Sequence, residues 1–233
     1  MLREALTYPV RGEDAERRLL VGAILAVATG LLARLGVLAV FALLPAVVLA
    51  GYALSVVRTT AESPGGTAAV QGAPPAFADF RALAADGARA LAVGVGYLLV
   101  PAAALAVTVG GAIGGASAAG RPESLGPTVF VFGAGTVVLF LSLAFAYLLP
   151  AALTGVARTR RLSGALDRGR LRASAGDAGY FVAWVAALLV GGAAVVLLGS
   201  VAALGRLGEV VALAGSFYAL VAVARLFGRA ISG

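Results

Sequence analysis

Six arginines lie close together in the second half of the chain. They are Arg158, Arg160, Arg161, Arg168, Arg170 and Arg172. A guanidinium group forms paired hydrogen bonds with phosphate or carboxylate, and each basic residue near an anionic membrane contributes about 1 kcal/mol of attraction. The cluster therefore predicts a surface that binds anionic lipid headgroups or a partner protein. A simpler interpretation stays open, in which the arginines only fix the orientation of neighbouring helices in a membrane.

Four residue types are missing from the sequence: cysteine, histidine, lysine and asparagine. Without cysteine and histidine the chain can form no disulfide, no zinc or haem site with the usual ligands, and no Ser-His or Cys-His relay. We therefore expect no enzymatic activity, no cofactor and no metal. We expect no nucleic-acid partner either, because no aromatic residues alternate with the clustered arginines to stack on bases.

The composition indicates that these arginines belong to a membrane protein. Hydrophobic residues make up 61% of the 233 positions and charged residues only 12%, and the mean hydropathy is +1.00. A soluble domain of this size carries about 25% charged residues, because it must cover its surface with polar groups. The sequence thus predicts an all-α, polytopic transmembrane bundle that forms a single integral membrane domain, residues 1–233.

Six apolar stretches are candidates for crossing the lipid bilayer. A spanning helix needs roughly 20 apolar residues, and the first stretch is short, with Arg17, Arg18 and Arg34 near its ends. We interpret it as a span rather than a cleavable signal peptide, because the preceding residues mix acids with arginines and apolar sequence resumes directly after Arg34. The predicted spans are 19–33, 35–57, 88–119, 127–157, 178–204 and 207–227.

Two of the connections between spans are predicted to contain amphipathic helices that lie on the membrane surface. After a loop at 62–75, rich in Gly, Pro and Ala and predicted to be flexible, residues 77–91 place Phe77, Phe80 and Leu83 on one side of a helix and Asp86 on the other. The connection that holds the arginine cluster has a weaker apolar stripe of the same kind.

The distribution of arginines predicts the orientation in the membrane. With the N-terminus in the cytoplasm, 15 of the 18 arginines lie on the cytoplasmic side, and only Arg34, Arg121 and Arg206 lie on the other. Cytoplasmic loops carry such an excess in most membrane proteins. We therefore expect a multi-pass protein of the cell membrane with both termini in the cytoplasm.

Three further features concern the packing of the helices. Leu43-Leu44-Pro45-Ala46 recurs as Leu148-Leu149-Pro150-Ala151, which suggests a parallel internal repeat. Glycines spaced four apart, beginning at Gly110, are expected to let helices approach closely. Glu209 is the only acid inside a predicted span, and it is expected to cap its helix or to pair with Arg206.

Several short motifs, taken in order along the chain, resemble one known family. They are Tyr8-Pro9, Leu49-Ala50-Gly51-Tyr52, Val56-Val57-Arg58, Pro74-Pro75-Ala76-Phe77-Ala78-Asp79-Phe80, Asp86-Gly87, Leu148-Leu149-Pro150-Ala151-Ala152-Leu153, Ala157-Arg158, Arg161-Leu162 and Tyr180-Phe181-Val182-Ala183-Trp184. Together they resemble the archaeal, mostly haloarchaeal, membrane family numbered 4013 among the domains of unknown function. The resemblance implies a six-helix membrane domain and brings no catalytic residues with it.

Two classes of function stay open. The favoured hypothesis is a non-catalytic membrane module that binds anionic lipid or a partner protein through the arginine-rich cytoplasmic face. The alternative is a small permease or transporter of a neutral or lipid-like solute, working from helices that Pro45, Pro101 and Pro150 would kink. Ion-coupled transport is less favoured, because it normally uses acids or histidines buried at membrane depth and the middle of each predicted span has none.

Overall fold

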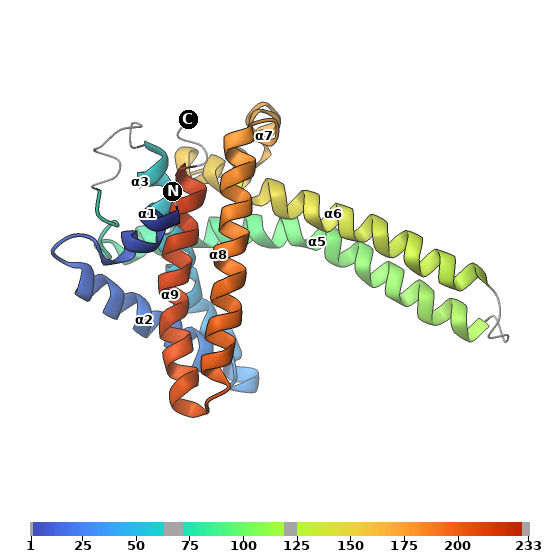
Figure 1. The fold of residues 1–233 in the computed structure, drawn as a ribbon, viewed down its shortest axis with the longest axis horizontal. Helices are drawn as coiled ribbons and strands as arrows, with labels where there is room; N and C mark the ends of the chain where they lie inside the picture. The colour runs from blue at the N-terminus through green and yellow to red at the C-terminus, as the bar shows by residue number, and fades with distance from the viewer. Residues whose placement is uncertain (1, 63–71, 119–124, 230–233) are drawn as a thin grey trace. The chain divides into compact units, whose positions relative to one another are not determined.

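The computed structural model describes residues 2–62, 72–118 and 125–229, and within these ranges every regular element is a helix (Figure 1). The prediction of an all-α protein is therefore confirmed for this part of the chain. The α-helices are α1 (Leu2–Thr7), α2 (Ala15–Leu32), α3 (Leu43–Glu62), α5 (Phe80–Ala118), α6 (Leu125–Thr159), α7 (Arg168–Ala175), α8 (Ala178–Ala202) and α9 (Arg206–Arg229). Three short 3₁₀ helices accompany them: η1 (Tyr8–Val10), η2 (Gly36–Ala42) and η3 (Leu162–Leu166).

Within the described ranges, five helical segments are long and apolar enough to cross a membrane, and they correspond to the second through sixth predicted spans. Each has at least 24 residues, which at about 1.5 Å per residue exceeds the roughly 30 Å of bilayer hydrocarbon. The structure thus supports a multi-pass membrane protein. The segments are Gly36–Glu62, Phe80–Gly110, Phe132–Thr159, Ala178–Ala202 and Arg206–Arg229.

The first predicted span coincides with α2, which does not belong to these five segments. The helix has 18 residues, and Glu16, Arg17 and Arg18 occupy its first turn. The remaining apolar part, 19–32, is about 21 Å long at the usual helical rise, shorter than the hydrocarbon layer. A span count of six stays a prediction.

The chain divides into two compact units, of which the first contains 1–91 and 151–233. In this unit α9 packs against α2, α3 and α8, and α8 and α9 lie side by side (Figure 1). Small and branched side chains fill the space around α9, with Val56 of α3 and Val221, Ala222 and Leu226 of α9 almost completely buried. A single domain over 1–233 stays a prediction.

The second unit contains residues 92–150, and its described residues belong to α5 and α6. Within it the rings of Tyr97 and Phe145 meet edge to face, with their centroids 5.7 Å apart. Many of its apolar side chains, such as Leu99 and Phe140, are exposed. An exposed apolar surface of this kind is expected of a segment that is surrounded by lipid.

The connections differ from the expected amphipathic helices. Phe77 lies outside any helix, three residues before the start of α5 at Phe80. From Phe80 onward α5 continues without a break into the following apolar stretch. The second connection is divided between η3 and α7, and α7 has no buried residue. Neither amphipathic helix is confirmed, nor is the internal repeat, and most of the 62–75 loop lies outside the described residues.

Among the glycines that the structure describes, two mark a very close approach between helix backbones, and neither was predicted to do so. A Cβ added to Gly51 of α3 would lie 1.9 Å from the carbonyl oxygen of Leu83 of α5, and one added to Gly87 would lie 1.7 Å from that of Val47. At Gly110, where a close approach was expected, an added Cβ would meet no atom of the described residues within 4 Å, and the surroundings of the glycines that follow it lie outside the described part of the chain. Gly51 and Gly87 therefore determine how α3 and α5 cross.

Candidate functional site

The arginine-rich connector, residues 158–172, runs from the end of α6 to α7. Arg158 lies in the last turn of α6, and α7 begins at Arg168. Only Arg170 is half-buried, and the other five arginines are exposed. The structure thus presents the predicted site residues mainly to the outside.

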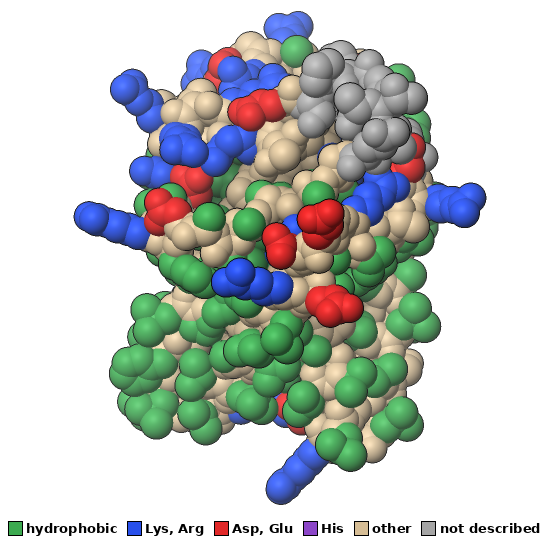
Figure 2. Space-filling model, turned by 90° about the vertical axis from the view of Figure 1, so that its left-hand side faces the viewer, with side chains coloured by type: hydrophobic (Ala, Val, Ile, Leu, Met, Phe, Trp, Pro, Cys, Tyr) green, Lys and Arg blue, Asp and Glu red, His purple; other side chains and the backbone are tan. Residues whose placement is uncertain are grey.

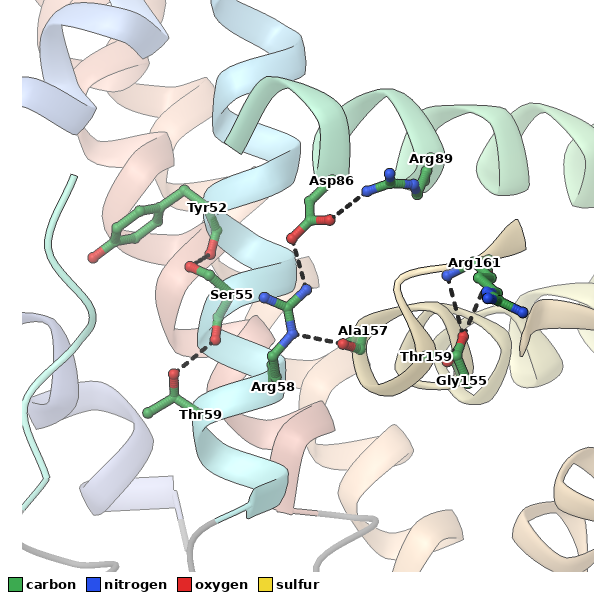
Figure 3. A network of polar contacts seen from close by, with 10 residues as sticks. All are labelled: Tyr52, Ser55, Arg58, Thr59, Asp86, Arg89, Gly155, Ala157, Thr159 and Arg161. Carbon is green, nitrogen blue, oxygen red and sulfur yellow. Dashed lines mark hydrogen bonds and ion pairs between the residues drawn. The ribbon is translucent and has the colours of Figure 1, made fainter. Parts of the chain in front are cut away.

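Two glycines hold the connector against the end of α6. A Cβ added to Gly155 would lie 2.1 Å from the carbonyl oxygen of Gly164. Gly164 and Ala165 of η3 are buried as a result of this contact. The hydroxyl of Thr159 donates to the carbonyl oxygen of Gly155 at 2.9 Å and accepts a hydrogen bond from the backbone N–H of Arg161 at 3.3 Å (Figure 3). The connector is therefore folded back as a compact turn.

Asp167 is the only acid in the connector, and it begins α7. Its Oδ1 accepts a hydrogen bond from the backbone N–H of Arg170 at 3.1 Å, which satisfies a free donor at the helix start. Its Oδ2 lies 3.8 Å from Nη2 of Arg170. The connector thus contains one carboxylate and six guanidinium groups, and it keeps a strong positive charge.

Two exposed leucines accompany the arginines. Leu162 is 51% exposed and Leu166 is 72% exposed, and both belong to η3, between Arg161 and Arg168. Transfer of exposed leucines into the boundary between headgroups and acyl chains lowers the free energy. Neighbouring arginines can reach the phosphates at the same time. The connector therefore combines the two side-chain types that a membrane surface attracts.

A buried ion-pair network ties the start of the connector to α3 and α5. Arg58 of α3 donates through Nε to the carbonyl oxygen of Ala157 at 2.5 Å and through Nη2 to Oδ2 of Asp86 at 2.7 Å (Figure 3). Arg89 donates through Nη1 to the other carboxylate oxygen at 2.7 Å. Asp86 is only 5% exposed. The network fixes the last turn of α6, from which the connector leaves.

The role of Asp86 was not predicted, because the sequence pattern places this residue on the polar side of a surface helix. The spacing of Asp86 and Arg89, three residues apart on a helix, was the available signal for an ion pair. Nothing in the sequence indicated that Arg58, 28 residues earlier, would complete the network.

A second polar cluster joins the beginning and the end of the described chain. The guanidinium of Arg225 lies 4.3 Å from the centroid of the Tyr8 ring, in cation–π geometry, and donates to the hydroxyl of Thr60 at 3.0 Å. Burial raises the pKa of Tyr8, so its phenol stays neutral. Arg229 pairs with Glu4 nearby. These contacts hold α1 and η1 against the C-terminal turns of α9.

The opposite end of α9 contacts the end of α2. Glu209 pairs with Arg34, which follows α2. The expected partner of Glu209, Arg206, lies on the same helix. The observed partner lies in the turn between α2 and η2, so the pair links two parts of the chain that are far apart in the sequence. The chain therefore reaches, between Tyr8 and Arg34, from one end of α9 to the other.

Charge and apolar surface are separated on the face shown in Figure 2. Arginine and acidic side chains gather over the upper half, and hydrophobic side chains cover most of the lower half. Such a division is expected where headgroups give way to hydrocarbon. Among the residues that the structure describes, no three Asp or Glu side chains are grouped so that they could hold a metal ion.

Comparison with known families gives one match. The profile of a family described as a protein of unknown function, DUF4013, matches residues 34–203, well over half of the chain. The chain belongs to the DUF4013 family. The DUF4013 match includes α3 and α5 to α8 with the whole arginine-rich connector, and it begins after α2. No curated protein and no solved structure matches the chain.

Proposed function

We propose that the protein is a non-catalytic module of the cell membrane, whose arginine-rich connector binds anionic lipid headgroups or an acidic region of a partner protein. The observation that carries the proposal is the exposure of five of the six connector arginines next to exposed Leu162 and Leu166. The Arg58 network supports it further, because it holds the connector in a defined place on α3 and α5.

We further propose six spans with both termini in the cytoplasm, which places the connector on the cytoplasmic side. The contacts of α1 and η1 with the end of α9, together with the pair between Arg34 and Glu209 at its start, support a chain that crosses along α2. Arg17, Arg18 and Arg34 can extend their charges to the two interfaces, which would let a short helix span. An archaeal origin stays a prediction from the family resemblance.

Lipid selectivity of the reconstituted full-length protein tests the proposal. Spin-labelled phosphatidylglycerol and phosphatidylcholine are compared for association with the protein in vesicles. We expect preference for phosphatidylglycerol, reduced when Arg161 and Arg168 are both replaced by Gln, because each arginine near an anionic surface contributes about 1 kcal/mol. Added salt should reduce the preference as well.

The matched control replaces Arg3 and Arg81 by Gln, which removes the same charge from exposed positions outside the connector. This variant should keep most of the preference. Equal selectivity in the connector variant and the unchanged protein would remove anionic lipid as the ligand. Copurification of one protein that is lost only in the connector variant would assign the connector to a protein partner.

A further inference from the structure

A cleft of about 340 Å³ lies between the start of α2 and the segment that precedes α5. Both polar and apolar side chains line it. They include Asp14, Arg17, Arg18, Val21, Phe77 and Phe80. The volume is at the lower end of the roughly 300–1,000 Å³ that is typical of small-molecule sites.

Arg18 is the unusual residue of the cleft. It is 8% exposed, and among the described residues no acid pairs with it. Its Nη2 donates to the carbonyl oxygen of Arg11, and its Nε is buried without a hydrogen-bond partner in the described part of the chain. A buried cation without a counter-charge is costly. An anion that enters the cleft would lower that cost.

The charges of the cleft match a ligand with one negative charge. Arg17 and Arg18 supply two positive charges, and the carboxylate of Asp14 compensates one of them. A phosphodiester carries one negative charge and accepts the paired hydrogen bonds that a guanidinium donates. A doubly charged phosphate monoester would meet more repulsion from Asp14.

The apolar part of the cleft favours a lipid over a free phosphate ion. Phe77, Phe80 and Val21 border the arginines, and Leu20 and Ile24 of α2 continue outward as exposed apolar side chains. The stacked rings of Tyr52 and Phe77, with centroids 4.1 Å apart, hold Phe77 in place. An acyl chain can lie along this surface while the phosphate reaches the arginines.

We propose that this cleft binds the phosphodiester headgroup of one anionic membrane lipid, with Arg18 and Arg17 on the phosphate and Phe77 and Phe80 against the glycerol and acyl chains. The site is separate from the arginine-rich connector, and it uses α2, which the connector does not include. It would hold one lipid at a fixed place rather than attract many to a surface.

Native mass spectrometry of the full-length protein in detergent tests this site. Phosphatidylglycerol, a diacylglycerol with the same chains, and inorganic phosphate are the three probes. We expect one tightly bound phosphatidylglycerol, no bound diacylglycerol, and no displacement of the lipid by millimolar phosphate. Arg18→Gln and Arg17→Gln should each weaken the affinity for this lipid about tenfold, as expected for the loss of one charge-assisted contact.

Arg17→Gln guards against a folding defect in the Arg18 variant, because Arg17 is exposed. Arg81→Gln is the matched control, since Arg81 is an exposed arginine just after Phe80 that does not line the cleft. The Arg161 and Arg168 double variant should keep the bound lipid, so the two sites can fail independently. The proposal would be overturned if both cleft variants kept their affinity for phosphatidylglycerol, or if Arg81→Gln lost as much affinity as they do. It would also be overturned if diacylglycerol bound as tightly as phosphatidylglycerol. Complete displacement by inorganic phosphate would instead assign the cleft to free phosphate and overturn the lipid.

Discussion

At the scale of single residues, Asp86 is the acid that is most deeply buried among the described residues. One carboxylate receives hydrogen bonds from both Arg58 and Arg89 and is almost completely buried. A buried ion pair contributes little compared with an apolar replacement, but removal of one partner leaves an uncompensated charge. The side chain of Arg58 is only 15% exposed, so its guanidinium would be a buried charge without compensation if Asp86 were removed.

We therefore expect Asp86→Asn to lower the free energy of unfolding by about 3 kcal/mol. Asp79→Asn is the control, because Asp79 is exposed and uses its Oδ1 to accept the backbone N–H of Ala82 at 3.0 Å, a bond that asparagine can keep. The measurement is unfolding of the purified protein in mixed micelles with increasing denaturant. A loss of similar size in both variants would contradict the assignment of Asp86 as the central charge.

At the scale of helices, the crossing of α3 and α5 depends on the absence of side chains at Gly51 and Gly87. The two backbones lie so close at these glycines that no space remains for a methyl group, and the nearest atoms are backbone carbonyl oxygens. Backbone cannot move aside as a flexible side chain can. The same argument applies to Gly155 and Gly164 at the base of the connector.

Gly51→Ala is expected to destabilise the protein by about 1–3 kcal/mol, because the two helices must separate to admit the new methyl group. Gly94→Ala provides the matched control on α5. An added Cβ there meets open space, and alanine favours a helix over glycine by up to about 1 kcal/mol. The midpoint temperature of thermal unfolding in detergent should be unchanged or higher in Gly94→Ala and lower in Gly51→Ala, each compared with the unchanged protein. The reverse order would show that the crossing tolerates a wider separation.

At the scale of the whole molecule, the prediction concerns which side of the membrane each part occupies. Six spans place Arg3 and Ser163 on the cytoplasmic side and Arg206 on the other. If α2 does not cross, Arg3 and Ser163 lie on opposite sides. The N-terminal helix would then have to leave its contacts with the end of α9.

The chain contains no cysteine, so single cysteines can report each position. We expect Arg3→Cys and Ser163→Cys in intact cells to resist an impermeant thiol reagent and to react after permeabilisation, while Arg206→Cys reacts in intact cells. Arg206 is exposed in the turn between the fifth and sixth predicted spans, where a water-soluble reagent can reach it. Reaction of Arg3→Cys in intact cells would contradict six spans with a cytoplasmic N-terminus.

The sequence predicted the helices much better than their contacts. Long apolar runs gave the positions of the five segments because a helix in lipid satisfies its backbone internally and needs only length and apolar side chains. Prediction from the sequence was incomplete where a contact depended on residues that are distant in the sequence and become neighbours only in the folded protein. Glu209 was expected to cap its helix or to pair with Arg206, and it pairs with Arg34. A close approach was expected at the glycines that begin at Gly110, whose surroundings lie largely outside the described residues, and the structure shows a different one at Gly51 and Gly87.

The candidate sites divide in the same way. The connector arginines follow from the sequence, because charges crowded into one loop stay near each other whatever the packing. The cleft does not, since Arg18 on α2 meets Phe77 and Phe80 only after α2 and the segment before α5 come together. Nor did the sequence distinguish Arg18 from exposed Arg17 beside it.

Local composition thus determined that this chain forms apolar helices and carries a strongly basic connector, because transfer of each segment into lipid depends on its own residues. Tertiary structure alone decided which charges are buried and paired, since a guanidinium is compensated only by a group that packing brings within hydrogen-bond distance. That is why Asp86 and Arg18 became visible only once the helices were placed against one another.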